Sequence, residues 1–193
     1  MNRLLKKGVC IGVLFLVAIA NGQNEASLKV TYPNNGSLII AGGGALPEEI
    51  IKTFIDLAGG ADAPIVVVPT AAGLKEYDDN WGKIISDQGA SNVVVLHTDS
   101  KKEANSKKFV QPLKNANGVW FVGGRQWRLA DSYLDTATEK AFWDVLDRGG
   151  VIGGTSAGAT IQGSYLVRGD TKTNQIMMGG NEKGYAFLYY VDF

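Results

Sequence analysis

The sequence has very little cysteine and histidine, with one of each, Cys10 and His97, among 193 residues. It has no excess of charge of one sign, because 19 basic residues balance 19 acidic ones. A nucleic-acid partner is therefore not expected, since such proteins present a basic surface. The composition is 45% hydrophobic and 20% charged. These values are typical of one globular domain, which can bury a sizeable core but leaves little room for a second.

The longest apolar run, residues 9–20, is too short to span a membrane comfortably. It follows the basic residues Arg3, Lys6 and Lys7, and small residues come at its end. This pattern is typical of a secretory signal peptide. We predict a signal peptide over residues 1–22, a secreted or periplasmic protein, and no membrane association after cleavage. An uncleaved N-terminal anchor is the alternative.

Cleavage would remove Cys10, the only cysteine, together with three basic residues and no acidic ones. The remaining 16 basic and 19 acidic side chains give a net charge of −3. Without cysteine, the mature protein can form no disulfide, so its core alone must stabilise it. A cysteine nucleophile is excluded as well, and with it the cysteine peptidases and glutamine amidotransferases.

Five short runs rich in Val and Ile alternate with segments of helical periodicity. The runs show little polar alternation, as expected for strands that are buried on both faces of a parallel sheet. They cover residues 37–41, 65–68, 92–96, 119–122 and 151–152. This alternation predicts a three-layer α/β sandwich with a mainly parallel, doubly wound sheet. We place this domain at residues 37–193, after a polar segment at 23–36.

Two of the helical segments have clear boundaries. Pro47 can open the first helix as its first residue. The second begins with a capping box of Thr136 and Glu139 and can end at Gly149. The residues predicted to face the core are Ile50, Phe54, Leu57 and Ala58 in the first helix, and Phe142, Val145 and Leu146 in the second.

Glycine-rich or polar clusters follow four of the five predicted strands. They occupy residues 42–44, 69–73, 123–126 and 153–156. Strand-to-helix turns often need glycine for conformational reasons alone. In a parallel sheet, however, ligands bind at the carboxyl ends of the strands, so several such clusters at one edge indicate a binding site.

The segment Gly154-Thr155-Ser156-Ala157-Gly158 fits the G-x-S-x-G pattern of a nucleophile elbow. A strand precedes it and a predicted helix follows it, which is the context that the pattern requires. The serine of such an elbow lies on a tight, strained turn, so the residues two positions away must be small. We therefore predict that Ser156 is a nucleophile presented at a helix N-terminus.

The residues around this elbow resemble a known family in sequence order and spacing. Residues 153–159 (Gly-Gly-Thr-Ser-Ala-Gly-Ala) are similar to the active-site signature of cyanophycinases and the related aspartyl dipeptidases, which are serine peptidases. Residues 120–129 resemble the substrate-side loop of that family, in which a Gly-Gly pair precedes a glutamine. Residues 39–44 and 65–71 resemble its first and second strands.

The resemblance implies a flavodoxin-like fold, similar to that of class I glutamine amidotransferases, and hydrolysis of peptides at aspartyl residues. It implies no metal and no organic cofactor, and it leaves a homodimer open. Arg125 departs from the small or acidic residue expected there, which bears on substrate preference. The implied roles are Ser156 as nucleophile, Ala157, Gly43 and Gly44 as backbone oxyanion donors, and Gly123, Gly124 and Gln126 as substrate-binding residues.

The general base is missing from the sequence. In the family, a histidine in an Asp-Gln-His sequence lies downstream of the serine. Residues 184–193 resemble the lead-in to that motif, so we expect a C-terminally incomplete domain that is inactive by itself. His97 follows a predicted strand and is expected to be a locally hydrogen-bonded residue at the strand end rather than the base. Asp170 is a candidate third member of the triad, or equally a turn residue beside Gly169.

Three functions remain open on the sequence. The first is a serine peptidase of the cyanophycinase kind. The second is a secreted, non-catalytic binding protein that keeps the pocket without the base. The third is an esterase of the α/β-hydrolase kind, which is disfavoured because no histidine precedes the glycines at 42–44.

Overall fold

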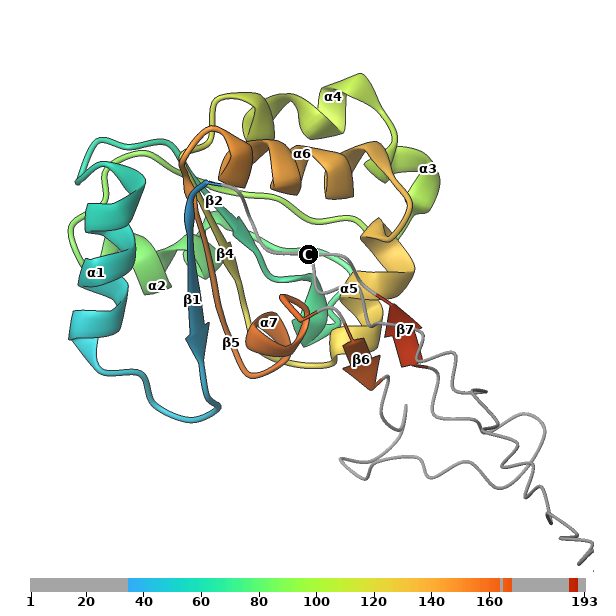
Figure 1. Ribbon diagram of the computed structural model, residues 1–193, viewed down its shortest axis with the longest axis horizontal. Coiled ribbons are helices and arrows are strands. Elements are labelled where there is room, and N and C mark those ends of the chain that lie inside the picture. Colours follow the sequence, from blue (N-terminus) through green and yellow to red (C-terminus); the bar gives the residue numbers. More distant parts are fainter. Residues whose placement is uncertain (1–34, 164, 168–187, 191–193) are drawn as a thin grey trace, which may run out of the picture.

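A parallel sheet of five strands forms the centre of the molecule. The computed structural model describes residues 35–163, 165–167 and 188–190 (Figure 1). The strand order is β1-β5-β4-β2-β3, and all neighbouring pairs are parallel. A second, antiparallel sheet pairs β6 with β7. The bounds are β1 Ser37–Ala41, β2 Ile65–Val68, β3 Val93–Val95, β4 Gly118–Phe121, β5 Val151–Thr155, β6 Tyr165–Val167 and β7 Leu188–Tyr190.

Helices cover both faces of the five-stranded sheet, which makes three layers with a flavodoxin-like fold. The α-helices are α1 Glu48–Ala58, α2 Lys83–Ser86, α3 Lys101–Ala104, α4 Lys107–Val110, α5 Gln126–Tyr133, α6 Ala137–Asp147 and α7 Ala157–Thr160. Three short 3-10 helices are also present: η1 Thr70–Ala72 and η2 Asp79–Gly82 between β2 and α2, and η3 Gln111–Lys114 between α4 and β4. Helices α1 and α2 lie on one side of the sheet, and α3, α4 and α6 on the other (Figure 1). Because crossovers between parallel strands are right-handed, the change of side follows from the chain reversing its direction across the sheet after β3.

The strands alternate their side chains between two separate cores. Toward α5 and α6, the sheet contributes Val66, Val68, Val119, Phe121 and Ile152. Toward α1, it contributes Ile65, Val67, Trp120 and Val151. Burial on both faces explains why these strands have continuous apolar runs rather than alternating ones.

The predicted strands are all present, and β5 is longer than expected. Its last three residues, Gly153, Gly154 and Thr155, pair with β1, and the two glycines pair with β4 as well. The apolar run ends at Ile152, so hydrophobicity alone could not reveal that the glycines belong to a strand. Ser156 therefore follows directly on a strand that is held on both sides.

Helix α1 departs from its prediction in two details. It begins at Glu48, and Pro47 is its N-cap residue in an extended conformation, not its first helical residue. The predicted core position Leu57 is 43% exposed. The buried face consists instead of Ile51, Phe54, Ile55 and Ala58, whose spacing of three and four residues forms one continuous stripe.

Helix α6 confirms its predicted boundaries. The hydroxyl of Thr136 accepts a hydrogen bond from the Glu139 N–H, and the Glu139 carboxylate accepts one from the backbone of Asp135. The predicted core residues Phe142, Val145 and Leu146 are buried. After the helix, Gly149 adopts a left-handed conformation (φ 88°), and its N–H donates to Leu146.

Some expectations concern residues outside those that the structure describes. The predicted signal peptide at residues 1–22 and the candidate triad member Asp170 both belong to this group. Within the described residues, no helix is both long and apolar enough to cross a lipid bilayer.

Candidate functional site

The four glycine-rich or polar clusters meet at one edge of the sheet, as predicted. They follow β1, β5, β4 and β2, which are four consecutive strands in the sheet. The Thr155 hydroxyl donates to the carbonyl of Gly42 at 2.7 Å, which ties the end of β5 to the turn after β1. This arrangement places Ser156 in the middle of the edge, with a glycine-rich turn on each side.

Ser156 adopts the strained backbone conformation of a nucleophile elbow. Its φ is 54° and its ψ is −113°, in a region that residues other than glycine rarely occupy. Its N–H donates to the carbonyl of Ala41 at 3.1 Å, which anchors the turn to β1. Helix α7 starts at the next residue, Ala157. The side chain of Ser156 is exposed, and within the described residues its hydroxyl has no hydrogen-bond partner.

Gly43 and Gly123 lie against Ser156 from opposite neighbouring strands. A Cβ atom on Gly43 would lie 3.7 Å from the Ser156 hydroxyl oxygen, and one on Gly123 would lie 3.3 Å from the Ser156 Cβ. The contact at Gly43 would be an ordinary van der Waals contact, whereas the contact at Gly123 would be tight. The two glycines leave the space around the nucleophile open to a substrate.

The loop after β4 is held against the turn after β2. The N–H of Arg125 donates to the carbonyl of Ala71 at 2.8 Å, and the Arg128 guanidinium donates to the same oxygen at 2.9 Å. Gly124 has a φ of 146°, and a Cβ there would lie 2.1 Å from that oxygen, so only glycine fits. Gln126, the predicted substrate-binding residue, begins α5 and is half-buried.

His97 belongs to a hydrogen-bonded chain away from the nucleophile. Its Nδ1 lies 2.8 Å from the Thr70 hydroxyl, which lies 2.7 Å from the Tyr133 hydroxyl. The Tyr133 oxygen accepts from the N–H of Thr98 at 3.2 Å. One consistent assignment has Tyr133 donating to Thr70 and Thr70 donating to Nδ1, with the His97 proton on Nε2.

The two ionisable residues of this hydrogen-bonded network, His97 and Tyr133, have shifted pKa values. Burial lowers the pKa of His97 from 6.5, against the opposing effects of Asp99 and Glu103. Burial also raises the pKa of Tyr133 to about 12. Both groups are therefore neutral near pH 7. Neither Thr70 nor Tyr133 was singled out from the sequence, because their pairing joins residues 63 positions apart.

His97 is locally hydrogen-bonded just after a strand, as expected, and its position argues against it as the base for Ser156. It follows β3, and the sheet places β2 and β4 between β3 and β5. Three interstrand spacings of about 4.8 Å separate the two strands by roughly 14 Å, which is beyond hydrogen-bond reach. Within the described residues, no group of three or more His, Cys, Asp or Glu side chains could hold a metal ion.

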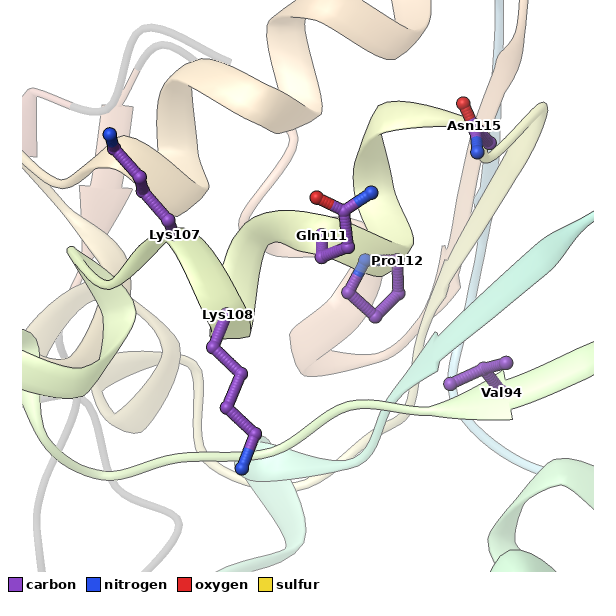
Figure 2. A pocket seen from close by; sticks show the side chains of 6 residues that line it. All are labelled: Val94, Lys107, Lys108, Gln111, Pro112 and Asn115. Carbon is purple, nitrogen blue, oxygen red and sulfur yellow. The ribbon is translucent and has the colours of Figure 1, made fainter.

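A cavity lies beside β3, which is the edge strand of the sheet opposite β1. It lies between β3 and the segment formed by α4 and η3, with a volume of about 730 Å³. Its lining side chains are Val94, Lys107, Lys108, Gln111, Pro112 and Asn115 (Figure 2). None of the residues around Ser156 contributes to it, so this cavity is not part of the candidate site.

Comparison with known proteins agrees with this arrangement. The model of peptidase family S51 matches residues 38–188. The chain is 30% identical to the cyanophycinase of Geminocystis herdmanii over 124 residues, which are 63% of this chain and 46% of that protein. It is also 30% identical to the cyanophycinase of Synechococcus elongatus over 156 residues, 75% of this chain and 48% of that protein. The chain thus spans about half the length of the curated relatives it matches.

A solved structure has a similar fold. The crystal structure of a peptidase from an acI-B1 Actinobacterium aligns with a TM-score of 0.57 and 25% identity, over 68% of this chain and 58% of that one. The family model covers most of the described domain, including every strand of the five-stranded sheet and the serine elbow. The chain belongs to peptidase family S51.

Proposed function

We propose that Ser156 is the nucleophile of a serine peptidase that cleaves peptides at aspartyl residues. The observation that carries the proposal is the conformation of Ser156, a positive-φ residue between β5 and α7. Such strain persists only where the surrounding structure enforces it, and it is concentrated at functional sites. Gly43 and Gly123 keep the space beside the hydroxyl open.

The proposed reaction is acyl transfer through a covalent intermediate. The Ser156 oxygen bonds to the carbonyl carbon while its proton passes to a general base, and the carbonyl electron pair moves onto oxygen. The tetrahedral intermediate then expels the amine, which takes up the proton, and water hydrolyses the acyl-enzyme. The N–H of Ala157, at the start of α7, and the Gly43–Gly44 turn are proposed to stabilise the oxyanion.

The substrate is proposed to lie along the loop after β4. In this arrangement Gly123, Gly124 and Gln126 line the subsite for the aspartyl residue. Arg125 belongs to the same loop and adds a positive charge to it, which suits a substrate with a carboxylate. Export remains part of the proposal, with residues 1–22 as the signal peptide and a secreted or periplasmic location.

We further propose that the 193-residue chain by itself does not turn over substrate. Its only histidine is His97, which is bound to Thr70 and is separated from Ser156 by two strands. Asp170 is proposed as the residue that would orient a histidine base. A binding protein without catalysis is the second candidate, and the same observation on His97 supports it.

Labelling with a fluorophosphonate probe tests the proposal, because the probe reacts only with an activated serine. The samples are this chain, its Ser156→Ala variant and a form extended through the following codons of the gene. Labelling of the extended form alone, lost in Ser156→Ala, supports a peptidase whose base lies outside this chain. Labelling of this chain that disappears in His97→Gln would show that His97 is the base. No labelling in any form would favour the binding protein.

A further inference from the structure

An apolar pocket lies beside Val122, the first residue after β4, on the side of the sheet that carries α1 and α2. Its lining residues are Asn80, Trp81, Ile84 and Val122, which enclose about 320 Å³. We call it the Trp81 pocket. Three of the four lining side chains are apolar and half-buried, and the amide of Asn80 is the only polar one. That volume lies at the small end for ligand sites and is large enough for one large side chain.

The Trp81 pocket is linked to Ser156 through the segment that directly follows β4. Val122, in its wall, directly precedes Gly123, whose Cβ position lies 3.3 Å from the Ser156 Cβ. The N–H of Val122 donates to the carbonyl of Val68 at 3.1 Å, so this wall is fixed to β2. One wall of the pocket and one contact of Ser156 thus come from the consecutive residues Val122 and Gly123.

A second, charged pocket of about 330 Å³ adjoins the first at Ile84, which lines both. It starts at Gly44, directly after Gly43 beside the Ser156 hydroxyl. The two pockets thus extend from the glycines on either side of the nucleophile. The other residues lining the charged pocket are Leu46, Glu48, Ile51, Lys83, Asp87 and Gln88. Because this second pocket contains Glu48, Lys83 and Asp87, a large apolar side chain is favoured in the Trp81 pocket instead.

The wall that carries Trp81 is held in place by aromatic packing. The Trp81 ring packs edge-on against Tyr77 at 5.0 Å between centroids, and Tyr77 packs against His97 at 4.4 Å. Gly82, buried after Trp81, lies so close to Val93 that a Cβ would be 3.1 Å from its side chain. The hydrogen-bonded chain through His97 and Thr70 thus supports the shape of the pocket.

We propose that the Trp81 pocket receives the apolar side chain of the substrate residue on the leaving-group side of the scissile bond. This inference rests on the proposed function, in which the aspartyl residue that supplies the carbonyl lies toward Gly123 and Gln126. The preferred substrates are then Asp-Phe and Asp-Leu. Asp-Gly leaves the pocket unfilled, and Asp-Lys places a charge among apolar walls.

Binding of these four dipeptides to the 193-residue chain, measured by isothermal titration calorimetry, tests the inference. We expect Asp-Phe and Asp-Leu to bind about ten-fold more tightly than Asp-Gly, from burial of the side chain. Trp81→Ala should remove this preference while leaving the affinity for Asp-Gly within about two-fold. The matched control is Trp143→Phe, because Trp143 packs on the opposite face of the sheet and should not affect the preference.

Val122→Thr provides a second variant in case Trp81→Ala fails to fold. The threonine side chain has almost the same shape, and position 122 is only half-buried, so the fold should be kept while the added hydroxyl reduces the preference for Asp-Phe. Equal affinities for Asp-Phe and Asp-Gly, a preference that survives both substitutions, or no saturable binding of any dipeptide would overturn the inference. Because the measurement needs no reactive hydroxyl, Ser156→Ala should retain the preference. If the preference for Asp-Phe is found but no form of the protein is labelled at Ser156, the inference about the pocket stands and the proposed peptidase function fails.

Discussion

Gly158 packs directly against the backbone carbonyl of Phe121, so that a Cβ at position 158 would lie 2.1 Å from its oxygen. The other glycine of the elbow, Gly154, is equally confined, because its Cβ would lie 2.4 Å from the carbonyl oxygen of Gly158. These contacts place α7 close against β4 and β5 and hold Ser156 at the sheet edge. The two glycines of the G-x-S-x-G pattern are therefore required by packing, independently of any chemistry at the serine.

Gly158→Ala should destabilise the protein by roughly 2–4 kcal/mol, because the added methyl group meets backbone atoms that cannot move aside cheaply. The sign is informative, since glycine-to-alanine changes within helices usually stabilise by up to about 1 kcal/mol. Urea unfolding followed by circular dichroism measures the difference.

The matched control is Gly42→Ala. Gly42 has no atom within 4 Å of its Cβ position, and its φ is not in the left-handed region. Its substitution should change the free energy of unfolding by less than about 0.5 kcal/mol. Similar losses at both positions would show that packing against Phe121 is not the cause.

The fold could be predicted from the sequence to a large extent, because burial on both faces gives each parallel strand an unbroken apolar run. The prediction failed at positions where the hydrophobicity of a residue does not indicate whether it is buried. Gly153 and Gly154 belong to β5 although they have no side chain to signal burial. Leu57 is apolar but exposed, because the helix stripe through Ile51 and Ile55 already faces the sheet.

For the candidate site, it could be predicted which residue clusters lie together, but not how far apart individual residues are. The spacing of strands and turns was enough to bring residues 42–44, 123–126 and 153–156 together, since they all follow parallel strands. Strand order is a tertiary property, so the separation of His97 from Ser156 by two intervening strands could not be read from the chain. The bond between Thr70 and Tyr133 was missed for the same reason.

Tyr133→Phe should destabilise the protein by about 1–3 kcal/mol. The Tyr133 hydroxyl is buried between Thr70 and the N–H of Thr98, and its loss would leave that N–H without its partner. Tyr77→Phe is the control, because the Tyr77 hydroxyl bonds the exposed N–H of Leu74, which water can reach. We expect a change within about 0.5 kcal/mol there. Thermal unfolding near pH 7.5 compares the two, and equal effects would contradict the buried network.

Acidification should destabilise the protein through His97. Burial lowers its pKa in the folded state below the ordinary value of 6.5, so the unfolded chain binds the proton more readily. The resulting stability is present above pH 6.5 and is lost as the pH falls through the lower, folded-state pKa. Unfolding free energies measured across about pH 5 to 8 should therefore decrease toward the acid end of this range.

His97→Gln isolates this effect, because the amide can accept the bond from Thr70 but does not titrate. The variant should show a flatter pH dependence below pH 6.5 than the parent chain. Since His97 is the only histidine in the sequence, no other imidazole contributes to the difference. A variant with the same acid slope as the parent would assign the loss to other groups.

The strain at Ser156 predicts a trade-off between stability and reactivity. Ser156→Ala keeps a Cβ at φ 54° and ψ −113°, whereas Ser156→Gly removes it from a region that favours glycine. We therefore expect the Gly variant to be more stable than the Ala variant by roughly 1 kcal/mol, measured by urea unfolding. Both should fail to react with a fluorophosphonate probe in the extended form of the protein. An Ala variant that is as stable as the Gly variant would mean that the turn is not strained, and the main structural support for a nucleophile at this position would be lost.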